Sequence, residues 1–579
     1  MSVSSGDPQA TFAATLVDEW VRGGVTHAVV CPGSRSTPLV LALADRDEIQ
    51  LHVRLDERGA CFFALGLSVA TGVPSVVCTT SGTAAAELHA GVVEASHAGV
   101  PLIVCTADRP PRLHGVGAPQ TIEQSNLYGG AVRWFFEPGP ADGDDTAEWR
   151  SIGARSVVEA VTGAGPVHLN LAFDEPLLGT AGPLPEGRGA GAPWAAASAR
   201  PSIPVDIARD AERWGRPGVI VAGGGTPVPP MVLEVADRLG WPVLADPRSG
   251  LRVDHPAVIA AADAFLRDPG VRDALKPRTV LSFGGPWASR VVAEFLADAG
   301  AAGAEIVAVN PSPTVDPDKV LHRVLRGDPF GLLEALASAP VTGQAQWRRR
   351  WERIEVAAQG AIDKTLDNDP FSAGGRATEP GVLRHLFADL DAAHSLVVAS
   401  SMPIRDLEWF GAPRSNPPRV LANRGANGID GVTSTAFGTA AGVGGPVVAV
   451  LGDLAFLHDV SALVPVGDAT GSCTLVVLDN GGGGIFNFLP QAGAMSVERF
   501  ERLFGTAPRV PIREVARGFG LPVADVSTLA GLDEALERFV GVPARSVIRV
   551  ALPSRTDNVA LHERIHRAVG ESARSVLAG

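Results

Sequence analysis

The chain has 579 residues, of which 46% are hydrophobic and 19% are charged, and its formal net charge is −14. This length exceeds what one hydrophobic core can serve, so several domains are expected. The acidic balance argues against a nucleic-acid partner, because a phosphate backbone demands a basic surface. The longest uncharged stretch, 431–452, is broken by Pro446 and several glycines, so we expect no membrane span.

The cysteines and the N-terminus indicate a cytoplasmic protein. The five cysteines are scattered through apolar runs without any CxxC pair, which is typical of reduced, buried thiols. The first twenty residues lack the basic segment and the apolar core of a signal peptide. Lysine occurs only three times, away from every motif considered below, which argues against Schiff-base and P-loop chemistry.

Strand-like apolar runs alternate with helical stretches along the chain. Up to about residue 180 the runs are THAVVCPG, IQLHVRLDE, PSVVCTTSG, VPLIVCTADRP and GPVHLNLAF. A Gly/Pro/Ala-rich linker (178–204) precedes a second group of runs, GVIVAGGG, WPVLADPRSG, TVLSFGGP and EIVAVNPSP. A charged helical stretch (346–367) precedes the third group, SLVVASSMPIRD, RVLANRGANGID, VVAVLGDL, TLVVLDNGG and SVIRVALPSR. Such alternation predicts parallel sheets covered by helices. We therefore expect an α/β protein with three tandem domains, at 1–185, 200–340 and 375–579.

Two runs in the last domain each end in a side chain that carries an oxygen ligand. Asp453 ends one run, and Asn480, followed by four glycines, ends the next; 27 positions separate them. That spacing fits a strand, a crossover and a second strand, which places both side chains at one sheet edge. Oxygen ligands and close backbone approach suit a hard cation that holds a phosphate group. Asp and Gly are also common after strands in any α/β fold, which would explain either half alone.

Together the two halves resemble the GD…N motif with which thiamine-diphosphate enzymes bind Mg²⁺ and diphosphate. The motif includes Gly452, Asp453 and Leu454, where Leu454 stands in place of the commoner glycine, and the resemblance implies Asp453, Asn480 and the carbonyl of Gly482 as metal ligands. Such an enzyme also needs a carboxylic acid beside the aminopyrimidine. Glu57 begins an apolar helix after a strand-like run, and burial there would raise its pKa toward neutrality. An ordinary acidic residue in the first helical turn is the alternative.

Motifs throughout the chain resemble one particular family of these enzymes. They are CPGSRSTPL, DERGACFFALG, TTSGTA, VPLIVCTADRP, GAPQTIEQ, SSMPIRD, NRGANGIDG, GDLAFLHD and GGGGIFNFLP. In order and content they are similar to the 2-succinyl-5-enolpyruvyl-6-hydroxy-3-cyclohexene-1-carboxylate synthases of menaquinone biosynthesis. The resemblance implies thiamine diphosphate with Mg²⁺ or Mn²⁺ as cofactors, 2-oxoglutarate and isochorismate as substrates, and 1,4-addition of the succinyl-semialdehyde carbanion, formed by decarboxylation, to isochorismate.

The same resemblance assigns roles to further residues. Both substrates are dianions, and planar guanidinium groups suit carboxylates. Catalytic or substrate contacts fall on Ser34, Arg35, Arg109, Gln120, Arg290, Ser401, Arg405 and Arg424; Phe486 and Leu489 would line the substrate pocket, and Ile429 would support the bent cofactor. For any single arginine a surface position is the alternative, and for the three apolar residues it is core packing.

The sequence leaves two other functions open, and it leaves the assembly state open as well. Another thiamine-diphosphate enzyme, such as an acetolactate synthase or a 2-oxoacid decarboxylase, would need fewer cations in its site. A non-catalytic sensor with this fold would have no need of Glu57 beside Asp453 and Asn480. In the resembling family the residues corresponding to Glu57 and Asp453 meet across two chains, so we expect a homodimer or homotetramer with the site at the chain interface.

Overall fold

The fold is known from a computed structural model, which describes residues 7–141, 146–198, 200–285, 287–310, 316–464 and 471–579. In this part of the chain the strands form three six-stranded sheets, and every strand pair is parallel. The predicted α/β class, with three successive sheets, is thus confirmed. No described helix combines the length and the apolar character that a membrane span requires.

The N-terminal sheet has the strand order β2-β1-β3-β4-β6-β5. Its strands are β1 (His27–Val30), β2 (Gln50–Val53), β3 (Ser75–Thr79), β4 (Leu102–Asp108), β5 (Phe135–Phe136) and β6 (Pro166–Ala172). Its helices are α1 (Pro8–Arg22), α2 (Thr37–Ala44), α3 (Glu57–Thr71), α4 (Thr83–Glu87), α5 (His89–Ala98) and α6 (Thr146–Thr162). Strands β3, β4 and β6 are buried along their whole length, as continuous Val/Leu/Ile-rich runs in a doubly covered parallel sheet require.

The central sheet has the order β12-β11-β10-β7-β8-β9. Its strands are β7 (Gly218–Ala222), β8 (Val243–Ala245), β9 (Val258–Ile259), β10 (Thr279–Phe283), β11 (Glu305–Val309) and β12 (Arg323–Leu325). The accompanying helices are α7 (Ala211–Trp214), α8 (Pro229–Leu239), α9 (Ala262–Leu266), α10 (Pro269–Ala274), α11 (Arg290–Ala301), α12 (Phe330–Ala337), α13 (Ala345–Asp367) and α14 (Pro370–Ala373). The charged stretch predicted as a helix is α13.

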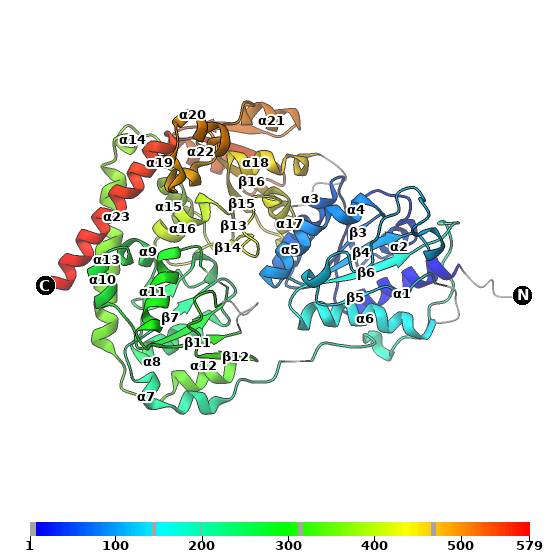
Figure 1. The fold of residues 1–579 in the computed structure, drawn as a ribbon, viewed down its shortest axis with the longest axis horizontal. Coiled ribbons are helices and arrows are strands. Elements are labelled where there is room, and N and C mark those ends of the chain that lie inside the picture. Colours follow the sequence, from blue (N-terminus) through cyan, green and yellow to red (C-terminus); the bar gives the residue numbers. More distant parts are fainter. Residues whose placement is uncertain (1–6, 142–145, 199, 286, 311–315, 465–470) are drawn as a thin grey trace, which may run out of the picture.

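The C-terminal sheet, with the order β14-β13-β15-β16-β18-β17, repeats the strand order of the N-terminal one. Its strands are β13 (Ser395–Val398), β14 (Arg419–Leu421), β15 (Val447–Gly452), β16 (Cys473–Asp479), β17 (Val523–Val526) and β18 (Arg545–Ala551). Its helices are α15 (Glu379–Asp389), α16 (Met402–Phe410), α17 (Val432–Val443), α18 (Asp453–His458), α19 (Gln491–Ala494), α20 (Val497–Phe500), α21 (Ile512–Gly518), α22 (Leu529–Phe539) and α23 (Arg555–Ala578). Helix α23 leaves this sheet and packs along α13 (Figure 1).

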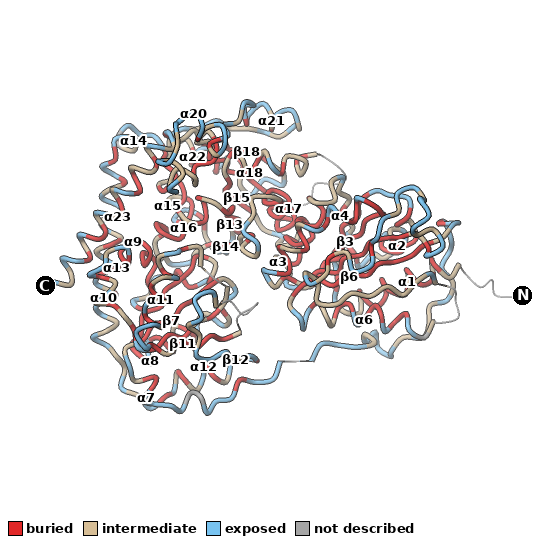
Figure 2. Tube along the Cα trace, in the orientation of Figure 1, coloured by how far each residue is buried: buried red, intermediate tan, exposed pale blue. Residues whose placement is uncertain are grey.

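Helices α3 and α17 join the N-terminal and C-terminal domains (Figure 1). A Cβ atom on Gly66 would lie 2.2 Å from the carbonyl oxygen of Thr435, and one on Gly438 would lie 2.0 Å from that of Phe63. Only glycine therefore permits the two backbones to approach this closely. The shared core that results contains buried side chains from both sheets, and burial follows the sheets and this helix pair in Figure 2.

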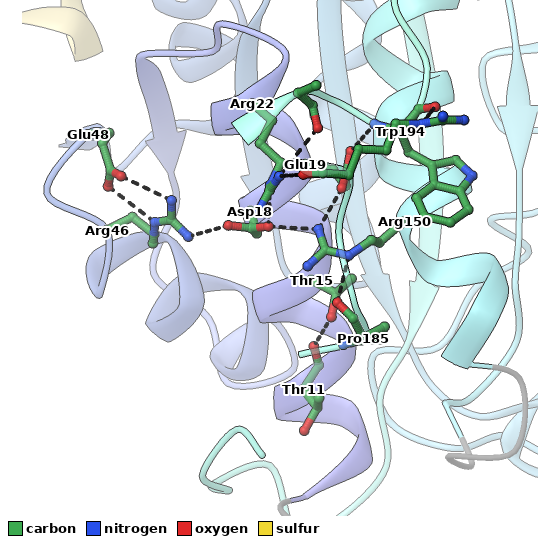
Figure 3. Close-up of polar contacts among 12 residues, drawn as sticks. Thr11, Thr15, Asp18, Glu19, Arg22, Arg46, Glu48, Arg150, Pro185 and Trp194 are labelled. Carbon is green, nitrogen blue, oxygen red and sulfur yellow. Dashed lines mark hydrogen bonds and ion pairs between the residues drawn. The ribbon is translucent and has the colours of Figure 1, made fainter. Parts of the chain in front are cut away.

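The predicted linker runs along the outside of the molecule and is fastened to α1 (Figures 1 and 3). Glu19 accepts a 2.8 Å hydrogen bond from the N–H of Trp194, and Arg150 donates to both Glu19 and Asp18 and to the carbonyl of Pro185. Burial alone would raise the pKa of Asp18, but hydrogen bonds from Arg150 and two further arginines lower it to about 2. Asp18 therefore stays charged at neutral pH, and the cluster anchors the linker at Pro185 and Trp194.

Candidate active site

A cavity of about 250 Å³ lies at the carboxyl edge of the C-terminal sheet. Strands β13 and β15 are neighbours there, and the strands that follow them in the chain, β14 and β16, lie on opposite flanks of this pair. The strand order therefore reverses between β13 and β15, which is the position where α/β sheets bind ligands. The lining comes from the segments that follow β13, β14, β15 and β16, together with the start of α15. The lining residues are Glu379, Ser400, Ser401, Met402, Pro403, Ile429, Gly452, Asp453, Leu454, Ala455, Leu478, Asn480, Gly482, Gly483, Gly484, Ile485 and Phe486.

Asp453 is held rigidly at this edge, at the first position of α18. The residue is 1% exposed, and its carboxylate accepts hydrogen bonds of 2.7 Å from the N–H groups of Leu454 and Gly482. Burial raises the pKa of Asp453 to about 6, although those hydrogen bonds act in the opposite direction. Gly452 pairs with Leu478 across β15 and β16, so Asp453 and Asn480 follow neighbouring strand ends as predicted.

Asn480 lines the same cavity as Asp453. Its Nδ2 donates a 2.6 Å hydrogen bond to Glu379, whereas its Oδ1 is buried without a hydrogen-bond partner. The glycines that follow adopt φ values of +79° at Gly481 and +123° at Gly482, and a Cβ on Gly482 would lie 2.1 Å from the carbonyl oxygen of Gly505. Glycine is therefore required for the backbone to curl beside Asp453.

The donor set fits a magnesium-like ion that holds a diphosphate. Asp453 offers a carboxylate, Asn480 offers an otherwise unpartnered amide oxygen, and Gly482 offers a carbonyl, which are the hard oxygen ligands that Mg²⁺ prefers. The remaining coordination positions would be filled by phosphate oxygens. The buried Oδ1 of Asn480 is costly without a partner, and a cation bound between it and the Asp453 carboxylate would satisfy it.

Three of the predicted polar residues meet beside this cavity. Ser401 lines it with an unusual φ of +78°, and its carbonyl accepts a 2.5 Å hydrogen bond from Arg405, one turn further along α16. Arg424 approaches Ser400, a neighbouring lining residue, with 3.4 Å between its Nη1 and the Ser400 Oγ. Burial lowers the pKa of Arg424 to about 10, and the nearby cations Arg248 and Arg405 add to this effect. The two guanidinium groups thus concentrate positive charge where an anionic substrate would gain most from it.

A second polar group gathers at the carboxyl edge of the N-terminal sheet. Arg35 is buried and donates to the carbonyl of Phe173 at 3.0 Å, and Arg109 donates to Ser81 and to the carbonyl of Gln120. Burial lowers the pKa of Arg109, and the neighbouring charge of Arg35 lowers it further. The side chain of Gln120 bonds to the carbonyl of Ser81, and Ser34 is exposed in the loop after β1.

Glu57 opens α3 as predicted. Asp56 caps this helix by accepting from the N–H of Gly59, and Arg58 reaches the end of α18, where it approaches Asp459 to within 3.7 Å. Burial raises the pKa of Glu57, and the carboxylates of Asp56 and Glu87 act in the same direction. Glu57 is not among the residues that line the cavity around Asp453 within one chain, and neither are Ser34, Arg35 and Gln120.

Some of the remaining predicted residues line the cavity around Asp453, and others lie outside it. Ile429 and Phe486 line the cavity, as do Gly452 and Leu454. Leu489 lies beyond η7 (Gly484–Phe488) and is 40% exposed, outside the lining. The side chain of Arg290 is 90% exposed at the start of α11 and pairs with Glu294. Their assignment to the substrate site remains a prediction.

Sequence reasoning missed Glu379, which contacts Asn480 directly. The TEPG segment at 378–381 signals a helix start, because Thr378 caps α15 and Pro380 suits its first turn. Nothing in that segment points to Asn480, which is 101 positions away. Burial raises the pKa of Glu379 to about 7, and the nearby carboxylate of Asp406 adds to the rise.

Comparison with known proteins shows which class of enzyme the chain belongs to. Three family models cover most of the chain: the N-terminal TPP binding domain of thiamine pyrophosphate enzymes at 10–127, the middle domain of thiamine pyrophosphate at 185–376, and the C-terminal TPP binding domain at 409–550. The fold is also similar to the crystal structure of benzoylformate decarboxylase from Polynucleobacter necessarius, with a TM-score of 0.72 and 18% identity over 94% of this chain and 98% of that one. The protein is a thiamine-diphosphate enzyme.

Curated relatives narrow the class to one family. A protein of Thermobifida fusca is 40% identical over 99% of this chain and 100% of its own length, and one of Myxococcus xanthus is 38% identical over 92% of this chain and 94% of its own. Both are named 2-succinyl-5-enolpyruvyl-6-hydroxy-3-cyclohexene-1-carboxylate synthase. This chain belongs to that family, and the resemblance seen in its motifs is confirmed.

Proposed function

We propose that the protein joins the four-carbon unit left by decarboxylation of 2-oxoglutarate to isochorismate, and so makes 2-succinyl-5-enolpyruvyl-6-hydroxy-3-cyclohexene-1-carboxylate for menaquinone biosynthesis. The names of the relatives support this reaction. The single structural observation that carries it is the juxtaposition of two features at one sheet edge. An oxygen-lined cation site at Asp453 and Asn480 lies beside the two partly buried guanidinium groups of Arg405 and Arg424.

The cation site would hold the diphosphate of the cofactor through Mg²⁺ or Mn²⁺. Asp453, the Oδ1 atom of Asn480 and the carbonyl of Gly482 would be its protein ligands. Thiamine diphosphate, when bound, supplies a carbon nucleophile and accepts the electron pair released by decarboxylation. Ile429, an apolar residue in the same cavity, would pack against the body of the cofactor.

Glu57 would hold and exchange a proton with the aminopyrimidine of the cofactor. Its raised pKa brings proton exchange closer to neutral pH than an ordinary Glu allows. Arg405 and Arg424, with Ser401, would bind substrate carboxylates, because a guanidinium group in a partly buried site gains from pairing with them. Ser34, Arg35, Arg109, Gln120 and Arg290 are proposed as further contacts to the acidic substrates.

The active unit would be at least a homodimer. The cavity around Asp453 is lined within one chain by residues of the C-terminal domain alone, while Glu57, Ser34, Arg35 and Gln120 lie on the N-terminal domain. A partner chain that brings its N-terminal sheet edge over the cavity would complete the site.

All five cysteines are buried free thiols, which suits a reducing cytoplasm.

The test is a product analysis with purified protein. Incubation with thiamine diphosphate, Mg²⁺, 2-oxoglutarate and isochorismate should release carbon dioxide and give the carboxylate product, identified by mass spectrometry. Omission of isochorismate should abolish that product. Conversion of two pyruvate molecules to acetolactate at a comparable rate, without use of isochorismate, would contradict the proposal.

A further inference from the structure

The side chain of Asn480 must be turned the right way round to serve as a metal ligand. Its amide has an acceptor end, Oδ1, and a donor end, Nδ2, and only the oxygen can bind a cation. The two ends have nearly the same shape, so packing alone discriminates weakly between the two orientations. Some hydrogen-bonding group must therefore select the one with Oδ1 toward the cavity.

Glu379 is placed to make that selection. Its carboxyl group accepts a 2.6 Å hydrogen bond from Nδ2 of Asn480, and the residue is 2% exposed. While Glu379 is ionised, a reversed amide would place its oxygen against the Glu379 carboxylate oxygen across the same short distance, and the two acceptors would repel each other. In the observed orientation the partnerless Oδ1 is the end left for a cation.

Glu379 is fixed by the start of its helix and lies close to a second buried polar pair. It occupies the first turn of α15, where Thr378 accepts from the N–H of Gly381 and fixes the start of the helix. Behind it lies the buried pair of Asp406 and His562, joined by a 2.7 Å hydrogen bond between helices α16 and α23. Both groups interact electrostatically with Glu379, which itself lines the cavity.

We propose that Glu379 is a positioning residue for the cation site: it fixes the amide of Asn480 so that Oδ1 faces the ion that binds the cofactor diphosphate. Groups that orient metal ligands in this way commonly change metal affinity about 10- to 100-fold when removed. The inference rests on the proposed function, because the ion concerned is the one that holds thiamine diphosphate.

The experiment measures thiamine-diphosphate binding by calorimetry at a series of Mg²⁺ concentrations. Glu379→Met keeps the length of the side chain but removes the acceptor, and we expect its half-saturating Mg²⁺ concentration to rise about 10- to 100-fold, with full cofactor binding restored at high Mg²⁺. Glu379→Gln retains an oxygen acceptor and should shift less. The exposed Glu537 of α22 supplies a matched control, Glu537→Met, with no shift expected.

A second pair of variants isolates the orienting role. Asn480→Asp presents an oxygen at either end and needs no orientation, so adding Glu379→Met to it should not weaken the Mg²⁺ dependence further. An equal loss in both backgrounds would overturn the inference. So would an unchanged Mg²⁺ dependence in Glu379→Met, or a loss of cofactor binding that high Mg²⁺ does not restore. Failure of the wild type to bind thiamine diphosphate with Mg²⁺ would instead overturn the proposed function, and the inference with it.

Discussion

Glu94 of α5 accepts a 2.7 Å hydrogen bond from the main-chain N–H of Gly425. Its other carboxylate oxygen accepts from the N–H of Ala426 at 2.6 Å, and the residue is 3% exposed. A Cβ on Gly425 would lie 2.4 Å from the Glu94 carbonyl oxygen, so the contact demands glycine there. The loop held in this way carries Arg424 and Ile429, so a residue of the N-terminal domain fixes a site loop of the C-terminal domain.

Glu94→Ala should therefore loosen this junction. Two N–H groups would lose their acceptor, and each unsatisfied donor costs about 1–3 kcal/mol when water cannot replace the partner. Glu94 borders a cavity of about 440 Å³, and water entering there should keep the total loss to roughly 1–3 kcal/mol. Calorimetric unfolding should show a lower midpoint for Glu94→Ala than for wild type. The exposed Glu537→Ala is the control, and equal midpoints in all three proteins would contradict the assigned contact.

Asp453→Ala should abolish Mg²⁺-dependent binding of thiamine diphosphate. The cofactor diphosphate would lose its bridging cation and face the amide and carbonyl oxygens of the site directly. Calorimetry with and without Mg²⁺ checks this, with Asp367→Ala, an exposed carboxylate at the end of α13, as the control. Cofactor affinity equal to that of wild type would remove Asp453 from the metal site.

Glu57→Gln should bind the cofactor but turn over slowly. An amide cannot exchange the proton, and acid–base assistance of this kind is typically worth about 10²-fold or more in rate. Calorimetry should give a cofactor affinity near that of wild type, while the steady-state rate falls. A rate equal to that of wild type would leave Glu57 as an ordinary helix-start residue.

Mixing two inactive variants tests where the site is assembled. If Glu57 of one chain serves the cavity of another, a dimer of one Glu57→Gln chain and one Asp453→Ala chain contains one site with both changes and one with neither. Co-expression of the two variants should then restore activity, to about a quarter of wild type when chains pair at random, since half of the dimers are mixed and each has one intact site. If both residues act within one chain, the mixture stays inactive.

Arg405→Met should reduce discrimination between acidic and neutral donors. Pyruvate lacks the distal carboxylate of 2-oxoglutarate, so it leaves a partly buried guanidinium unpaired, at a cost of about 2–5 kcal/mol, or roughly 30-fold to several-thousand-fold in kcat/KM. The variant should lose most of its activity with 2-oxoglutarate and little of any activity with pyruvate. Steady-state rates with both donors decide this, with the exposed Arg517→Met as the control. Equal losses of activity with both donors would show that Arg405 does not bind the distal carboxylate.

Acid should destabilise the N-terminal domain through His168. This ring is fully buried in β6, and burial lowers its pKa to about 3. Folded His168 therefore stays neutral, while in the unfolded chain it takes up a proton near pH 6.5. Its contribution to stability is complete above pH 6.5 and is lost as the pH falls toward 3, by up to about 1.4 kcal/mol per pH unit.

Thermal unfolding at pH 7.5 and pH 5.5 measures this effect. The difference between the two midpoints should be smaller in His168→Gln than in wild type, because the variant has no ring to protonate. Replacement of the exposed His97 by Gln is the control and should leave the difference as in wild type. An unchanged difference in His168→Gln would show that the ring does not stay neutral in the folded chain.

Local patterns were enough to predict most strands of the three sheets, but not β5, β9, β12 and β17, which lie at sheet edges. Continuous apolar runs predicted the parallel strands, since a strand buried on both faces must be apolar at every position. The pairing of Asp453 with Asn480 followed from the crossover length alone, because parallel neighbours end at the same edge. Glu57 at a helix start was also visible locally, from the strand-like run before it and the apolar helical stretch after it.

Contacts between distant segments were decided by the tertiary structure. Glu379 precedes Asn480 by 101 positions, and Glu94 precedes Gly425 by 331; no periodicity or turn signal relates such residues. Their pairing depends on how helices and sheets pack, which satisfies buried donors and acceptors wherever the chain brings them together. The same holds for the pKa values of Asp453 and His168, because burial raises the pKa of a carboxyl group and lowers that of an imidazole, and burial belongs to the folded chain as a whole.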